Sequence, residues 1–189
     1  MRKVMTAMVL VAMVGLAACG SKPAQSQTPA PGDAKKAATE SLPAELMLKE
    51  APTGAKNVKD VKKEAKEGDE VVLRGRIGGS VEPFIDGRAV VQVADTSMIP
   101  CDQKEGDGCK TPWDLCCEEP KDIAAGSVMV QVAGADGKPL KVQMKGANGL
   151  DPNSVIVVKG KVGKKDGDNL TVNASGIFIE EKPKAKPKG

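Results

Sequence analysis

The chain has 189 residues, a formal net charge of +3 and no histidine, which leaves room for one domain with unstructured flanks. Without histidine the chain lacks the commonest general base at neutral pH and the commonest metal ligand. No Ser–His, Cys–His or paired-carboxylate arrangement can be assembled, so we expect no enzymatic activity, no catalytic residue and no cofactor. Residues 69–181 carry 13 Lys or Arg against 18 Asp or Glu. With this net charge of −5, the segment has no broad basic surface of the kind that attracts nucleic acid.

Residues 1–18 have the composition of an export signal. Arg2 and Lys3 precede an apolar run that ends in Leu16-Ala17-Ala18-Cys19. The run is shorter than the roughly 20 apolar residues that span a bilayer, which argues against a membrane-spanning helix. The small residues before the cysteine favour a lipobox over an ordinary secretory signal. The segment resembles a bacterial lipoprotein signal peptide, which implies cleavage before Cys19, acylation of that residue, and a membrane-anchored chain facing the periplasm or the cell exterior.

We expect residues 19–56 to consist of the acylated cysteine and a disordered tether, because the segment is rich in Ala, Pro, Lys and Ser. Within the tether, residues 43–48 could form one helical turn that docks Leu42, Leu46 and Met47 on the domain. Val58, Val61 and Ala65 recur at helical spacing, and predict a short amphipathic helix over residues 57–67. A disordered basic tail occupies residues 182–189.

Alternation of apolar and polar residues predicts six strands, at about 69–79, 88–94, 127–133, 139–145, 154–163 and 169–180. In the first strand Gly75 falls on the apolar face, where a glycine marks a bend or a close backbone approach. The pattern Ile156-Val157-Val158-Lys159-Gly160-Lys161-Val162 repeats the first strand in residue character. In the last strand the period slips across Ser175-Gly176, which predicts a β-bulge.

Together, the spacings Val71-x-Leu73-Arg74-Gly75, Ile156-x-Val158-Lys159-Gly160 and Leu170-x-Val172-x-Ala174 resemble the OB-fold, above all the small bacterial periplasmic OB-fold family and more distantly the anticodon-binding kind. The resemblance implies an all-β fold, a small OB-fold-like closed or partly open barrel over residues 57–181, preceded by the short helix. Other small barrels are the alternative. A cysteine-rich insertion, residues 95–126, separates the second and third strands.

The insertion contains the four remaining cysteines, Cys101, Cys109, Cys116 and Cys117. In an exported loop they predict two structural disulfides, with the adjacent pair not joined to each other. Gaps of seven, six and zero residues are poor spacing for zinc, no Cys-x-x-Cys supports redox chemistry, and the acids lack the spacing of a calcium loop. We therefore expect no metal. The run Cys-Lys-Thr-Pro-Trp-Asp-x-Cys-Cys is similar to uncharacterised exported bacterial proteins.

Trp113, the only tryptophan, is expected to pack over the disulfides as a small core, or else to serve as an exposed anchor for a partner. A basic stripe on the outward face is the other possible ligand surface, formed by Arg74, Arg76, Lys141, Lys145, Lys159 and Lys161. A solvated exterior is the alternative interpretation of these cations.

The sequence thus predicts a membrane-anchored, non-enzymatic binding module for a protein, a glycan or a small anionic ligand. Two alternatives remain: a nucleic-acid-binding OB-fold protein, and a metal-binding or redox protein that acts through the cysteines. The chain has only three aromatic residues, and proteins that bind single strands stack bases on aromatic side chains. Nucleic acid is therefore not the expected partner.

Overall fold

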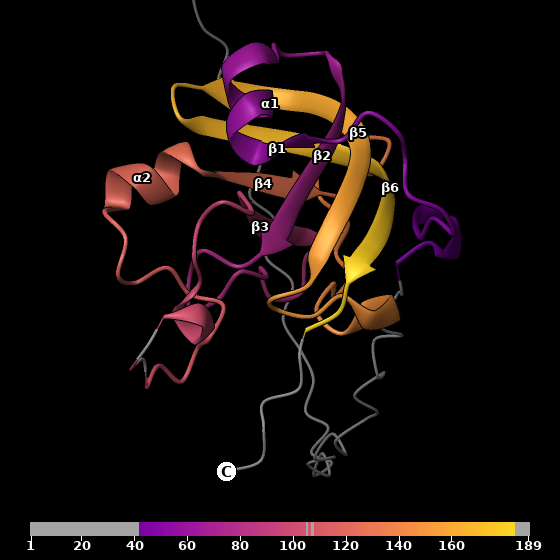
Figure 1. Cartoon of the computed structure of the whole chain (residues 1–189). Helices are drawn as coiled ribbons and strands as arrows, with labels where there is room; N and C mark the ends of the chain where they lie inside the picture. Colours follow the sequence, from indigo (N-terminus) through magenta and orange to yellow (C-terminus); the bar gives the residue numbers. More distant parts are fainter. Residues whose placement is uncertain (1–41, 105, 107, 184–189) are drawn as a thin grey trace, which may run out of the picture. The chain divides into compact units, whose positions relative to one another are not determined.

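Five strands pair into a closed ring, and a sixth, very short strand extends it (Figure 1). The computed structural model describes residues 42–183 except 105 and 107. The strands are β1 (Lys56–Asn57), β2 (Glu70–Ile77), β3 (Val90–Ala94), β4 (Ser127–Gln131), β5 (Val155–Asp166) and β6 (Asn169–Glu181). They follow the order β1-β2-β3-β4-β6-β5, and β5 pairs back with β2. Within the ring only β4 and β6 are parallel. This is the OB-fold connectivity, and the predicted fold class is confirmed.

Two glycines allow the strands to approach this closely. A Cβ on Gly75 would lie 2.4 Å from Val93 Cγ1 and 2.8 Å from the carbonyl oxygen of Ala94. A Cβ on Gly160 would lie 2.4 Å from the carbonyl oxygen of Asn173. All three distances are shorter than real side-chain contacts allow, so the close backbone approach predicted at Gly75 is confirmed and recurs in β5.

The predicted bulge in β6 is also present. Lys159 pairs with Gly176 and Gly160 pairs with Ala174, so Ser175 is the extra residue. An extra residue bends its strand and increases the local twist, which suits a strand that must curve around a small barrel.

The helix α1 (Val58–Glu64) contributes Val58 and Val61 to the apolar core of the barrel. The predicted helix is confirmed, with its end at Glu64 rather than at residue 67. Side chains of the barrel form hydrogen bonds with backbone groups at both ends of α1. At the N-terminus Asp95 accepts a hydrogen bond of 2.8 Å from the backbone N–H of Lys59. At the C-terminus Lys165 Nζ donates to the carbonyl oxygens of Lys62 and Ala65, at 2.7 and 2.8 Å. Backbone N–H groups at the start of a helix and C=O groups at its end have no partner within the helix, and these side chains supply one.

Asp95 is almost fully buried, with 2% of its surface exposed. Burial alone would raise the pKa of its carboxyl group. Backbone N–H donors from Lys59 and Ser97 outweigh that effect, so the pKa lies below its ordinary value of 3.8. The carboxylate is therefore charged at neutral pH and acts as a helix cap supplied from the end of β3.

The segment before α1 belongs to the folded domain. Leu42 and Leu46 are buried in the main core, and Leu46 ends a short 3-10 helix, η1 (Ala44–Leu46). Met47 bridges to Ile177 of β6, and the backbone N–H of Leu48 donates to the Ile177 carbonyl at 2.8 Å. The predicted docking of Leu42, Leu46 and Met47 is confirmed. The predicted tether boundary at residue 56 is wrong, because these apolar side chains bury themselves beside β6.

The strand predicted at residues 139–145 is not formed. Pro139 makes one isolated bridge with Ala133, and the chain then turns into η3 (Ala147–Gly149). Pairing stops after Leu140, whose N–H donates to the Val132 carbonyl and whose carbonyl accepts from the Ala89 N–H, both at 2.9 Å. Val142 and Met144 are nevertheless buried, so the alternation predicted burial correctly and the secondary structure incorrectly.

The predicted signal peptide, Cys19, the predicted tether up to residue 41, and the predicted tail from residue 184 lie outside the described residues. None of the helices in the described part of the chain is long and apolar enough to cross a membrane.

Candidate functional site

The insertion begins and ends where the sequence predicts, since β3 ends at Ala94 and β4 begins at Ser127. It contains two short helices, η2 (Cys101–Gln103) and α2 (Pro120–Ala125). Beneath them Met98 and Leu115 are buried against Ala94, and Ile123 of α2 packs on the same cluster. The insertion therefore has a small apolar core of its own that rests on the end of β3.

Trp113 is not part of that core. Its carbonyl oxygen accepts a hydrogen bond of 3.0 Å from the N–H of Gly79, and its Nε1 donates to the Val81 carbonyl at 3.0 Å. A Cβ on Gly78 would lie 2.4 Å from the Trp113 carbonyl oxygen, so only glycine admits this contact. The half-buried ring is anchored through its Nε1 to the loop that follows β2, and its predicted packing over the cysteines stays a prediction.

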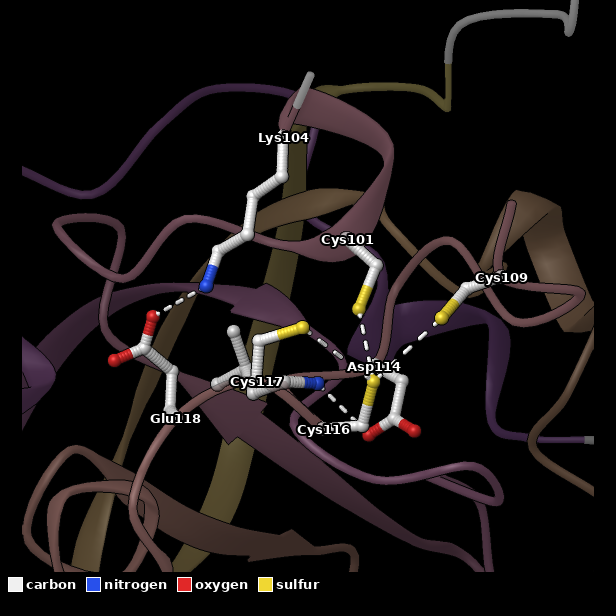
Figure 2. Close-up of polar contacts among 8 residues, drawn as sticks. Cys101, Lys104, Cys109, Asp114, Cys116, Cys117 and Glu118 are labelled. Atoms are coloured by element: carbon white, nitrogen blue, oxygen red, sulfur yellow. Dashed lines mark hydrogen bonds and ion pairs between the residues drawn. The ribbon is translucent and has the colours of Figure 1, made fainter. Parts of the chain in front are cut away.

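The four cysteines converge around Cys116 (Figure 2). The Sγ of Cys116 lies 3.3 Å from that of Cys101, 3.5 Å from that of Cys109 and 4.0 Å from that of Cys117. A disulfide needs about 2.05 Å, and the described residues contain no disulfide bond. The predicted disulfides are therefore absent from the structure. Two different sulfurs approach the same Cys116, an arrangement that no single pairing accounts for.

The predicted basic stripe is not a continuous surface. Arg74 forms an ion pair with Glu180 of β6 at 2.6 Å and also donates to Thr96. Arg76 is directed to the Asn153 carbonyl. Lys159 and Lys161 lie further along β5, opposite Val72 and Glu70, and Lys141 and Lys145 sit on the irregular segment that replaces a strand. The stripe prediction fails because Arg74 is paired, Arg76 is half-buried with its Nη1 directed to a backbone carbonyl, and two of its lysines are not on the sheet.

A different surface has the geometry of a binding site. A cavity of about 260 Å³ lies on the face of β3 and β4, and we call it the β3–β4 hollow. The turn between β5 and β6 borders it, and α2 of the insertion contributes part of its wall. Its polar lining consists of Gln92, Ser127, Asp168, Asn169 and Thr171, and its apolar lining is Pro120, Ile123, Ala124, Val128, Met129 and Leu170. In OB-folds this face and these loops bind oligonucleotides and oligosaccharides.

Ser127 is the most informative residue of the hollow. Its side chain is 9% exposed, and its Oγ has no hydrogen-bond partner among the described residues. Beside it, Gln92 accepts a hydrogen bond of 2.8 Å from Ser80 through Oε1, which fixes the orientation of the amide. A buried polar atom without a partner is costly. The Ser127 hydroxyl is therefore a group that a ligand could satisfy.

Lys62 of α1 holds the segments that border the hollow in place. Its Nζ donates to the carbonyl oxygens of Ala124, Ser127 and Asp168, the last two at 3.1 and 2.6 Å. These carbonyls come from α2, the start of β4 and the β5–β6 turn. Burial lowers the pKa of Lys62, and the charge of Asp168 partly offsets this effect. Because its three N–H groups are matched by three carbonyls, Lys62 acts as an internal clamp and not as a cation offered to a ligand.

A larger cavity, of about 620 Å³, lies between α1, β2 and the start of the domain. Five of its lining residues are charged: Lys56, Glu64, Asp69, Glu70 and Lys159. Lys56 and Glu64 are already paired at 2.5 Å on the exposed surface, and a surface pair of this kind is well solvated. The cavity contains no buried polar group without a partner, among the residues described there, so it offers less to a ligand than the hollow does.

The comparisons with known proteins give no family. No family model matches the sequence, and no curated protein matches it. Among solved structures, one similar chain is a protein assigned as an aspartyl-tRNA synthetase from Leishmania major Friedlin, at 10% identity and a TM-score of 0.37. The match covers 76% of this chain and 23% of that protein. A likeness at this level says nothing about function, and the site must be interpreted from its own residues.

We expect Lys62→Met to destabilise the domain and to open the hollow, because three carbonyl oxygens lose their donor. The loss in free energy of unfolding should be about 1–3 kcal/mol, measured by chemical denaturation. Lys63→Met is the matched control, since Lys63 is exposed on the same helix and an exposed substitution changes stability by only about 0.5 kcal/mol. Equal stability of the two variants would contradict the clamp.

Proposed function

We propose that this chain is an exported, lipid-anchored protein whose OB barrel is a non-enzymatic binding module for glycans. The ligand site is the β3–β4 hollow. One observation carries the assignment: a serine with a buried, unpartnered hydroxyl is among the residues that line a cavity whose other polar groups are amides, a hydroxyl and one carboxylate. Such groups bind neutral ligands rich in hydroxyl and amide groups, and the apolar lining suits the C–H faces of a sugar ring.

Charge separates the glycan from the other ligand classes of this fold. Asp168 is the one charged residue among those lining the hollow, and no lysine or arginine lines it. Phosphate-bearing and other anionic ligands need cations, and single-stranded nucleic acid also needs aromatic platforms. Neither is present among the lining residues. A neutral sugar chain requires neither cations nor aromatic platforms for binding.

Size points to a short stretch of glycan. The hollow, at about 260 Å³, lies below the roughly 300–1,000 Å³ of pockets that enclose whole drug-sized ligands. One sugar residue of a longer chain would enter it, while neighbouring residues would run along the outward face of β4 and β6. On that face Gln131 donates to Asn173 at 2.7 Å, which adds further amide groups beyond the hollow.

We expect the chain to bind N-acetylglucosamine oligomers, chosen as a neutral, amide-bearing probe, and Ser127→Ala to weaken that binding about threefold to tenfold. A single net hydrogen bond of about 0.5–1.5 kcal/mol corresponds to this range. The free energy of unfolding of Ser127→Ala should not fall, since the hydroxyl has no partner to lose. Calorimetric titration and chemical denaturation measure the two effects.

Ser175→Ala removes an exposed hydroxyl from the bulge of β6 and is the matched control, with unchanged affinity expected. Oligothymidine of similar length serves as the anionic competitor. Tight, salt-resistant binding of oligothymidine, or oligosaccharide binding that Ser127→Ala leaves intact, would overturn the proposal.

The membrane anchor is a separate part of the proposal and rests on Leu16-Ala17-Ala18-Cys19. Several acyl chains on one cysteine hold a protein stably on a membrane, where a single myristoyl chain does not. We expect the wild-type chain to partition into the detergent phase and Cys19→Ser to lose this partitioning or to accumulate unprocessed. Identical partitioning of the two would contradict the anchor.

A further inference from the structure

Three of the four sulfurs in the insertion, those of Cys101, Cys116 and Cys117, have the mutual spacing of ligands around one metal ion, and Cys109 lies outside this group although its Sγ is 3.5 Å from that of Cys116. In a tetrahedral site with Zn–S bonds of about 2.3 Å, neighbouring sulfurs lie about 3.8 Å apart. The three distances from Cys116, at 3.3, 3.5 and 4.0 Å, bracket that value. The sulfurs of Cys101, Cys116 and Cys117 also lie within 4.8 Å of one another. We propose that Cys101, Cys109, Cys116 and Cys117 bind a single thiophilic divalent cation, Zn²⁺ or an ion of the same preference.

Backbone contacts hold the two ends of this site together without help from the sulfurs. The N–H of Cys101 donates to the Asp114 carbonyl, and the N–H of Asp102 donates to the Pro112 carbonyl, both at 3.1 Å. Cys101 is 1% exposed, and Leu115, which precedes Cys116, is 2% exposed. The turn that carries Cys101 is thereby fixed against the segment that leads to Cys116. Surrounding contacts therefore hold the cysteines in place before any metal binds. Such support is typical of a functional metal site and not of cysteines that lie close together by chance.

The charge around the cluster suits thiolates. Four thiolates on a divalent cation leave a net charge of −2, which needs a nearby cation. Lys104 and Glu118 flank the sulfurs in Figure 2, with their charged groups 2.8 Å apart. Lys104 therefore places an ammonium group at the edge of the site, in a pair with Glu118 that is neutral overall.

Irregular spacing in the sequence does not count against such a site. Rules for zinc ligands describe pairs two to four residues apart that a single tight turn presents. Here η2 presents Cys101, while Cys116 and Cys117 come from the segment before α2. The fold, and not a local motif, brings them together. The competing outcome is oxidation to two disulfides, which an exported chain could undergo.

The test uses the full chain with Cys19→Ser, which removes the fifth thiol and leaves the cluster intact. Purified without chelator, this protein should contain one zinc per chain by elemental analysis, and its four thiols should become reactive only when the metal is released. Cobalt added to the apoprotein should give the intense visible absorption of a tetrahedral thiolate site. This spectrum is recorded with all four cysteines of the cluster unchanged, so it does not depend on whether substitution of a cysteine disturbs folding.

Cys109→Ser in the same background should raise the Kd for zinc by more than about 100-fold, since losing an outer-shell partner alone costs roughly 10–100-fold. Its barrel should remain folded by circular dichroism. The wild-type chain is the control and should match Cys19→Ser in zinc content. A metal-free protein with two disulfides, or one with four reactive thiols that bind neither zinc nor cobalt, would overturn the proposal. Neither result would bear on glycan binding in the hollow.

Discussion

Closure of the strand ring depends on two positions that cannot carry a Cβ. At Gly75 and Gly160 the backbone of a neighbouring strand, or a side chain on it, occupies the space that any other residue would need. With the ring closed, β4 and β6 pair in parallel through Met129–Thr171, Val130–Val172 and Gln131–Asn173. This pairing brings the β5–β6 turn beside the start of β4. The β3–β4 hollow therefore exists only because the ring closes.

The insertion adds to this barrel without being needed to close it. Its links to the barrel include the Trp113 contacts with Gly78 and Gly79 and the Lys62 clamp on Ala124. Through α2 the insertion supplies part of the wall of the hollow, and through its cysteines it supplies the proposed metal site. Because α2 begins three residues after Cys117, an ion bound by the cysteines would also restrain the wall of the ligand site. One loop would thus carry two kinds of binding chemistry.

What the sequence could predict follows from how local each signal is. The period-two pattern and its central glycine predicted β2 and β5, the slip at Ser175 predicted the bulge, and the ends of the second and third predicted strands set the limits of the insertion. Each of these signals lies within about ten residues. The strand predicted at 139–145 failed because alternation reports burial, and Val142 and Met144 are buried without pairing in a ladder. The basic stripe failed because Glu180, the partner of Arg74, lies more than 100 residues away. The hollow combines residues from several elements, so no single stretch predicts it. The four cysteines do lie in one stretch, but their spacing in the sequence does not show that their sulfurs converge on Cys116.

Ring closure can be tested most directly by adding one methyl group. Gly75→Ala places a Cβ 2.4 Å from Val93 Cγ1, whereas a Cβ on Gly108 meets nothing within 4 Å. Equilibrium unfolding should show Gly75→Ala to be less stable by about 1–3 kcal/mol, the usual cost of overpacking, and Gly108→Ala to lie within about 0.5 kcal/mol of the wild type. Equal stability of the two variants would contradict the claim that the barrel, and with it the ligand site, depends on close approach at Gly75.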